Sequence, residues 1–90
     1  MTVIARRLTV YGRVQGVFYR DWTVENAREL GLAGWVRNQP DGTVAALLQG
    51  GPGTVREMVE RMRSGPPRAR VERVEEAEAE AEELAGFARR

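Results

Sequence analysis

The first element of the chain is predicted by a period-two alternation of apolar and polar residues. The apolar side of this pattern consists of Ile4, Leu8, Val10 and Val14, and the polar side consists of Arg7, Thr9, Tyr11 and Arg13. Such alternation is typical of a strand with one buried and one solvated side. Arg6 falls on the apolar side, and the pattern does not explain it.

Helical spacing replaces this alternation in two segments. The first segment runs from about Asp21 to Leu30, with Gly31 as its C-terminal stop. The second segment is expected to begin at a capping box formed by Thr54 and Glu57. Its apolar residues follow the i, i+3, i+4, i+7 spacing of an amphipathic helix and are Val55, Met58, Val59 and Met62.

Four further strands complete the predicted secondary structure. Residues 32–38 and 43–49 form a hairpin, because Pro40-Asp41-Gly42 between them is a strong turn signal. Later in the chain, alanine and glutamate alternate at period two, although both are good helix formers. For that region we predict a strand over residues 69–77, a solvated acidic loop and a short edge strand over residues 86–90.

These elements follow the order βαββαβ, with the short strand at the end. Two helices with apolar stripes and a one-sided antiparallel sheet predict an α+β, ferredoxin-like two-layer sandwich with both helices on one face. Ninety residues suffice for a single domain, spanning residues 1–90, with a small core. No apolar run is long enough to span a membrane and no signal peptide is recognisable, so we interpret the chain as cytoplasmic and expect a monomer.

Composition narrows the chemistry. The chain has no cysteine, which excludes disulfides and a thiol nucleophile, and no histidine, which removes the commonest general base and metal ligand. All fourteen basic residues are arginine; a GC-rich genome would explain this, and a thermophilic source is a companion hypothesis. The net charge of +1 is too close to neutral to indicate nucleic acid as a partner.

The segment from Gly12 to Arg20 is the candidate functional site. It joins the first strand to the first helix and carries glycines at positions 12 and 16. Glycine lets backbone amides turn inward, and a helix N-terminus favours an anion. An arginine at this point adds planar donors that match phosphate or carboxylate. The structural alternative is a tight turn made by the glycines, with Arg20 as a solvated surface residue.

The loop also resembles a known family. Its pattern Gly-x-Val-Gln-Gly-Val-x-x-Arg, together with Gly34-Trp35-Val36-Arg37-Asn38 downstream, is similar to the two signature segments of the acylphosphatases. Membership would imply hydrolysis of the carboxyl-phosphate anhydride of small acyl phosphates, without a cofactor or metal. The resemblance implies that Arg20 holds the phosphate and Asn38 orients the attacking water. The expected phosphate loop comprises Gln15, Gly16, Val17, Phe18, Tyr19 and Arg20.

This chemistry is sufficient for an acyl phosphate. The departing carboxylate is a good leaving group, so no protonating side chain is required. A loop of this kind that formed a phosphoenzyme would carry a cysteine where this chain has Val14, so direct attack by water is expected. Inorganic phosphate or sulfate should compete with the substrate. The structural alternative for Asn38, which precedes a turn, is a side chain that bonds only the nearby backbone.

Two alternative functions are compatible with the same fold. A sheet that binds RNA would need interleaved aromatic residues, which the strands lack. A non-catalytic accessory domain that binds an acyl phosphate or phosphate would need the loop but not a residue that positions water. The presence of both Arg20 and Asn38 favours the enzyme.

Overall fold

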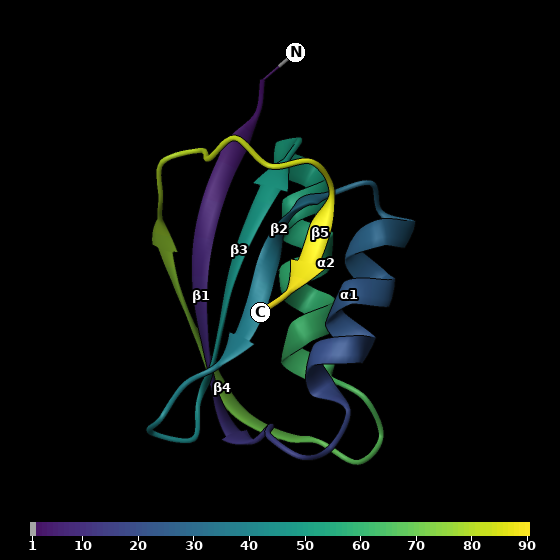
Figure 1. Cartoon of the computed structure of the whole chain (residues 1–90), viewed down its shortest axis with the longest axis vertical. Helices are drawn as coiled ribbons and strands as arrows, with labels where there is room; N and C mark the ends of the chain where they lie inside the picture. Colours follow the sequence, from purple (N-terminus) through teal and green to yellow (C-terminus); the bar gives the residue numbers. More distant parts are fainter. Residues whose placement is uncertain (1) are drawn as a thin grey trace.

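The computed structural model describes residues 2–90 of the chain. Its five strands form one sheet, and both helices cover the same face of that sheet (Figure 1). The strands are β1 (Ile4–Arg13), β2 (Ala33–Asn38), β3 (Val44–Gly50), β4 (Arg70–Glu78) and β5 (Phe87–Arg89). The predicted α+β, ferredoxin-like sandwich is therefore confirmed, including its short terminal strand.

The sheet has the order β4-β1-β3-β2-β5. Strand β1 pairs antiparallel with both β3 and β4, and β2 pairs antiparallel with β3. Strand β5 instead runs parallel to β2, with Gly34 opposite Phe87, so the sheet is mixed rather than wholly antiparallel. This parallel pairing places the last residues of the chain beside the end of β2, where Asn38 lies.

Helix α1 spans Tyr19–Glu29, and α2 spans Pro52–Ser64. As predicted, α1 ends at a glycine, because Gly31 adopts a left-handed conformation with φ 71°. The predicted capping box of α2 is wrong. Gly51 is the N-cap and makes no side-chain cap, and the fixed dihedral of Pro52 starts the helix before Thr54 is reached.

The main core lies between the sheet and the helices. It includes Leu8 and Val10 of β1 and Val14 directly after it, all from the predicted apolar side. Helix α2 contributes Val55, Met58, Val59 and Met62. Tyr19 is also fully buried there, and its hydroxyl donates to the main-chain oxygen of Met62 at 2.7 Å. This bond fixes the first turn of α1 against the last turn of α2. Arg6 of β1 pairs with Glu76 of β4 at 3.7 Å.

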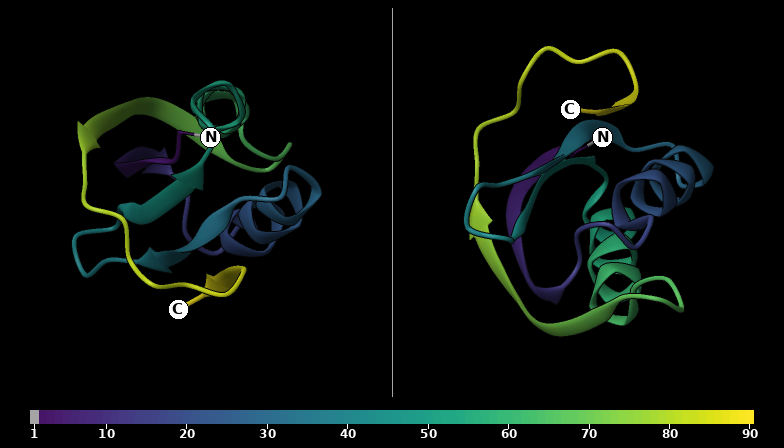
Figure 2. Two further views of the ribbon diagram at one scale, coloured as in Figure 1. Left: turned by 90° about the horizontal axis from the view of Figure 1, so that it is seen from above. Right: turned by 60° about the horizontal axis from the view of Figure 1, so that its bottom comes forward.

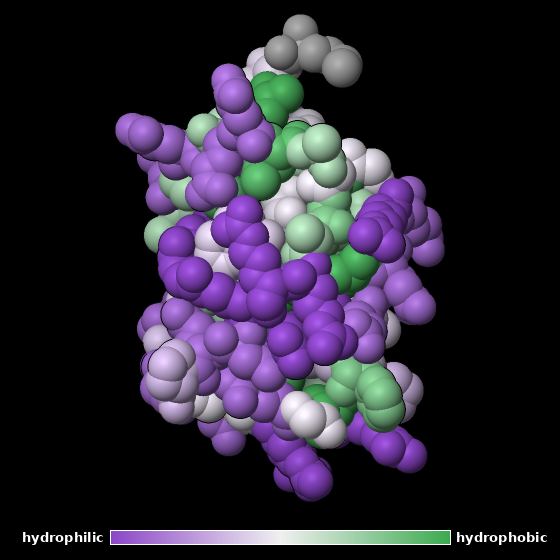
Figure 3. All heavy atoms as spheres, in the orientation of Figure 1, coloured by the Kyte–Doolittle hydropathy of each residue, from purple (hydrophilic) through white to green (hydrophobic). Residues whose placement is uncertain are grey.

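The other face of the sheet carries a smaller apolar cluster centred on Trp35. The segment between β4 and β5 runs along this side, away from the helices (Figure 2), and packs Ala79 and Leu84 against the cluster. The guanidinium groups of Arg7 and Arg37 lie over the Trp35 ring at 5.3 and 4.9 Å. Hydrophilic side chains accordingly cover much of the surface seen in Figure 3.

A bulge in β1 shapes the exit of the chain toward the loop. The pairing of β1 with β4 shifts register between Tyr11 and Gly12. Gly12 has φ 126°, and a Cβ at this position would overlap the carbonyl of Arg70. Glycine is thus required there by close backbone approach and by dihedral angle.

No helix within residues 2–90 is long and apolar enough to cross a membrane.

Candidate active site

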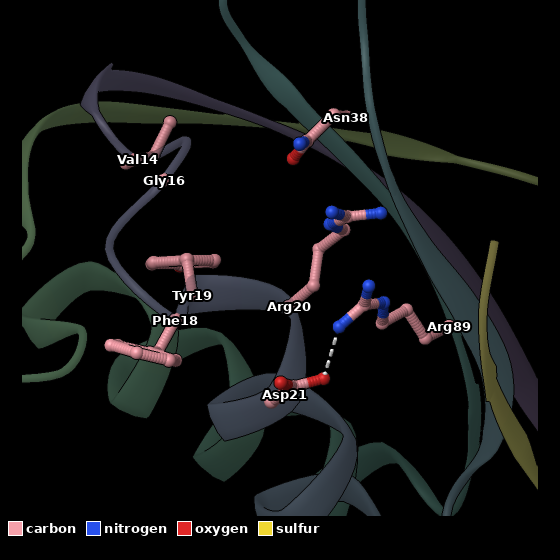
Figure 4. Close-up of a pocket in the computed structure, with 8 residues that line it drawn as sticks. All are labelled: Val14, Gly16, Phe18, Tyr19, Arg20, Asp21, Asn38 and Arg89. Atoms are coloured by element: carbon pink, nitrogen blue, oxygen red, sulfur yellow. Dashed lines mark hydrogen bonds and ion pairs between the residues drawn. The ribbon is translucent and has the colours of Figure 1, made fainter.

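A pocket of about 230 Å³ opens where the loop after β1, the start of α1 and the ends of β2 and β5 meet. Figure 4 shows the residues that line it, which are Val14, Gly16, Phe18, Tyr19, Arg20, Asp21, Asn38 and Arg89. The two residues that the sequence singled out for chemistry, Arg20 and Asn38, therefore face one cavity although they are far apart in the chain.

The loop backbone forms part of the wall of this pocket, which Gly16 lines without a side chain. Gly16 and Phe18 both adopt left-handed conformations, with φ 72° and φ 65°, and Phe18 is the N-cap of α1 without a side-chain cap. Among the described residues, no protein carbonyl accepts from the amides of residues 15–21. Unpaired amides at a helix N-terminus favour an anionic ligand through both hydrogen bonding and the helix dipole.

Arg20 lies in the first turn of α1 and extends across the pocket (Figure 4). Its Nη1 donates to the main-chain oxygen of Arg90 at 3.2 Å. A guanidinium has five N–H donors in a fixed plane, so this single bond sets its orientation and leaves donors for a ligand. The helix therefore supplies the position of the guanidinium, and the C-terminal residue supports its direction.

Asn38 is the last residue of β2, and its amide points into the pocket from the side opposite α1 (Figure 4). Its Oδ1 atom is buried, and within residues 2–90 nothing donates a hydrogen bond to it. A buried acceptor without a donor is costly, so such groups are normally satisfied by water or a ligand. Asn38 does not bond the nearby turn through Oδ1, which was the structural alternative for this residue.

Asp21 and Arg89 are pocket residues that the sequence analysis missed. Arg89 Nη1 lies 2.7 Å from Asp21 Oδ1, and both side chains are about half exposed. An acidic residue inside a candidate anion pocket is unexpected, and the guanidinium of Arg89 offsets its charge. An acid in the first turn of the predicted helix was a visible signal for Asp21. The parallel pairing of β5, which brings Arg89 here, had no local signal.

Two members of the predicted phosphate loop have side chains outside the pocket. Gln15 donates through Nε2 to the main-chain oxygens of Gln39 and Thr43, at 2.8 and 2.9 Å. It therefore ties the loop to the β2–β3 hairpin, which also carries Asn38. Val17 is 6% exposed and packs in the core. Their side chains thus support the loop and do not line the pocket.

Tyr19 borders the pocket but its ring belongs to the core, where burial raises the pKa of its hydroxyl well above the usual value.

In the part of the chain that the structure describes, no group of three or more acidic side chains is placed to hold a metal ion.

Comparison with known proteins points to one family. The family model described as acylphosphatase matches residues 6–89. An acylphosphatase of Acidovorax sp. (strain JS42) is 52% identical over 87 residues, which cover 97% of this chain and 90% of the relative. An acylphosphatase structure from Coxiella burnetii has a TM-score of 0.93 at 35% identity, covering 98% of this chain and 93% of that one. The acylphosphatase structure from Bacillus subtilis has a TM-score of 0.90 at 33% identity and 97% coverage of each chain.

Proposed function

Because the chain belongs to the acylphosphatase family and is an enzyme that hydrolyses acyl phosphates, we propose specific roles for its pocket residues in that reaction. The phosphoryl group binds the amides of residues 15–20 and the guanidinium of Arg20. Asn38 positions the water that attacks phosphorus. The observation that carries this assignment is the buried, unpaired Oδ1 of Asn38 facing the same cavity as Arg20.

The phosphate role follows from charge and geometry. The transferred phosphoryl group carries its negative charge on equatorial oxygens, and donors held ready around those oxygens stabilise the transition state. The loop amides lack protein acceptors, and Arg20 is oriented by Arg90. Both sets of donors are therefore in place before the substrate arrives, which avoids the cost of reorganisation during the reaction.

The water role follows from the chemistry of the amide. Asn38 Oδ1 can accept a hydrogen bond from water and so direct the water lone pair toward phosphorus, but an amide cannot act as a base at neutral pH. Catalysis by Asn38 therefore consists of placing the water in line with the leaving oxygen. Since carboxylate leaves readily, we propose that no general acid and no metal ion are needed.

The proposal is tested by following phosphate release from acetyl phosphate, with and without a chelator, in wild type, Arg20→Ala and Asn38→Ala. Arg20 would contact the phosphoryl oxygens in both ground and transition states, so its loss should weaken binding and slow turnover together. Asn38→Ala should keep phosphate affinity while kcat falls by about 10², as when one oriented transition-state donor is removed. Loss of wild-type activity on chelation, or normal turnover in Asn38→Ala, would contradict the assignment.

We also propose a setting for the enzyme. Residues 1–90 act as one domain and as a monomer in the cytoplasm, with phosphate and sulfate as competing anions and with no nucleic acid or membrane as a partner. The continuous five-stranded sheet supports a single domain. Size-exclusion chromatography would test the monomer, and cell fractionation would test the compartment. Inhibition by sulfate would test the anion site, and the melting temperature would test the hypothesis of a thermophilic source.

A further inference from the structure

A second cavity, of about 510 Å³, adjoins the phosphate pocket. Its apolar lining consists of Val17, Phe18, Trp22, Pro66 and Pro67. Phe18 and Asp21 line both cavities, so the two are neighbours at these residues. The proposed roles of Arg20, Asn38 and the loop amides leave this groove without a function.

Phe18 is held in an unusual conformation at the junction. Its φ of 65° is left-handed, a conformation that residues with a side chain rarely adopt, and the residue is 66% exposed. An exposed aromatic ring on a strained backbone is not explained by packing. Strain of this kind is typical of functional positions. Phe18 lines both the phosphate pocket and the groove, and the Arg68 guanidinium, whose side chain also lines the groove, lies 5.9 Å from the centre of its ring.

The direction of the reaction leads from one cavity to the other. In-line displacement requires the attacking water and the leaving oxygen on opposite sides of phosphorus. In Figure 4, Asn38 lies on one side of the Arg20 guanidinium, and Phe18 and Asp21 lie on the other. With phosphorus beside the Arg20 guanidinium and the water held by Asn38, as proposed above, the departing carboxylate would leave on the side of Phe18 and Asp21, which also line the groove.

We propose that this groove is the subsite for the acyl group, and that it selects acyl phosphates with an aromatic or large apolar acyl group. The proposal rests on the roles given above to Arg20 and Asn38. An aromatic acyl group would pack against Phe18, Trp22 and the prolines. The charged lining residues are two carboxylates, Asp21 and Glu25, against one guanidinium, Arg68, so an acyl group with a second negative charge gains no advantage.

Two phosphonates test the subsite without turnover. Phenacylphosphonate and acetonylphosphonate carry a methylene in place of the scissile oxygen of benzoyl and acetyl phosphate, and differ only in the acyl group. As competitive inhibitors of acetyl phosphate hydrolysis by the wild type, the phenacyl compound should bind at least about tenfold more tightly, the scale of small apolar differences in a fitted pocket. Equal inhibition constants would overturn the proposal.

Phe18→Gly removes the ring, and because glycine adopts a left-handed conformation without strain, we expect this variant to fold. This variant should lose most of the preference for phenacylphosphonate. Val3→Ala, which truncates an exposed apolar side chain far along the chain from the groove, should keep the wild-type ratio. A Phe18→Gly enzyme with the wild-type ratio would contradict the role of the ring.

Nuclear magnetic resonance gives a readout on the unaltered protein. The chain has two tryptophans, Trp22 in the groove and Trp35 on the far face of the sheet. Phenacylphosphonate should shift the indole N–H signal of Trp22, assigned with Trp22→Phe, and leave that of Trp35 in place. Acetonylphosphonate should shift neither indole. If both compounds inhibit and the Trp22 signal stays still, the groove proposal fails alone; if neither inhibits, the phosphate site fails with it.

Discussion

Arg20 Nη1 donates to the main-chain oxygen of Arg90 at 3.2 Å, joining the first turn of α1 to the end of β5. Two neighbouring contacts join the same elements: Arg28 Nη2 donates to the Phe87 oxygen at 3.1 Å, and Arg89 pairs with Asp21. The terminal strand therefore does more than extend the sheet, because it orients the arginine that we assign to the phosphate.

This double use of the Arg20 guanidinium predicts that Arg20→Lys will restore little. An ammonium has its three donors on a single nitrogen and lacks the planar fork, so it does not match two phosphoryl oxygens while it also bonds the Arg90 oxygen. In wild type, phosphate should raise the melting temperature by selective binding to the folded state, and this rise should be lost in Arg20→Lys. Arg28→Lys is the matched control, since Arg28 contacts β5 but does not line the phosphate pocket. If phosphate still raised the melting temperature of Arg20→Lys, the prediction would be refuted.

The Asp21–Arg89 pair should tune anion affinity. Asp21→Asn removes a negative charge from the pocket and should tighten phosphate binding, whereas Arg89→Ala leaves that charge uncompensated and should weaken it. Both side chains are about half exposed, so each effect should be modest, at most about fivefold, and should shrink as salt is added. Calorimetric titration of both single variants and the double variant would check this. Equal affinity in all four proteins would show that the pair is too screened to matter.

Tyr19 predicts a loss of stability in alkali. Its hydroxyl is buried, which raises its pKa above the ordinary 10.0. Above about pH 10 the unfolded chain releases the phenol proton while the folded chain keeps it, so the free energy of unfolding falls as pH rises. Tyr19→Phe should cost about 1 kcal/mol at neutral pH through the lost bond to Met62 and should flatten this alkaline decline.

Urea unfolding between pH 8 and 11 would measure this effect. Val59→Ala, a truncation in the same core, is the control, because it should lower stability at every pH without changing the slope. A slope in Tyr19→Phe equal to that of wild type would assign the alkaline decline to other groups.

The order and type of the elements could be predicted from the sequence because local signals agreed with the final packing. The stripe of Val55, Met58, Val59 and Met62 is buried as expected. The run of alanine and glutamate was the difficult case, and pairing with β1 overrides its helix propensity as far as Glu78. The start of α2 was misplaced because Gly51 and Pro52 begin a helix before the capping signal of Thr54 and Glu57.

The site was predictable to the extent that it is encoded locally. The loop and Arg20 occupy one stretch of chain, and Asn38 was reached through the resemblance of a second motif. Arg89 enters through a parallel strand pairing over 50 residues from its partner strand, which no local pattern encodes. Gln15 was predicted as part of the phosphate loop, but the sequence did not indicate the bonds that its side chain makes to the hairpin. Those bonds depend on which carbonyls the tertiary structure brings within its reach.

Asn38→Asp gives the sharpest test of the water-positioning role. The carboxylate keeps the shape of the amide and can accept hydrogen bonds, but it places a negative charge beside the phosphoryl group. Repulsion should weaken substrate binding and disfavour the transition state while the carboxylate is ionised. The bound phosphate and partial burial should also raise the pKa of this aspartate, because both disfavour its charged form.

The Asn38→Asp enzyme should therefore be poor near neutral pH and should improve as pH falls and the carboxyl group takes up a proton. Wild type and Asn38→Ala lack this group, so their kcat should not rise over the same range. Stopped-flow measurement of kcat between pH 4 and 8, with circular dichroism to confirm the fold, would show the difference. Activity in Asn38→Asp that rises with pH would mean that the carboxylate acts as a base on the water, and that placing the water is not the whole contribution of position 38.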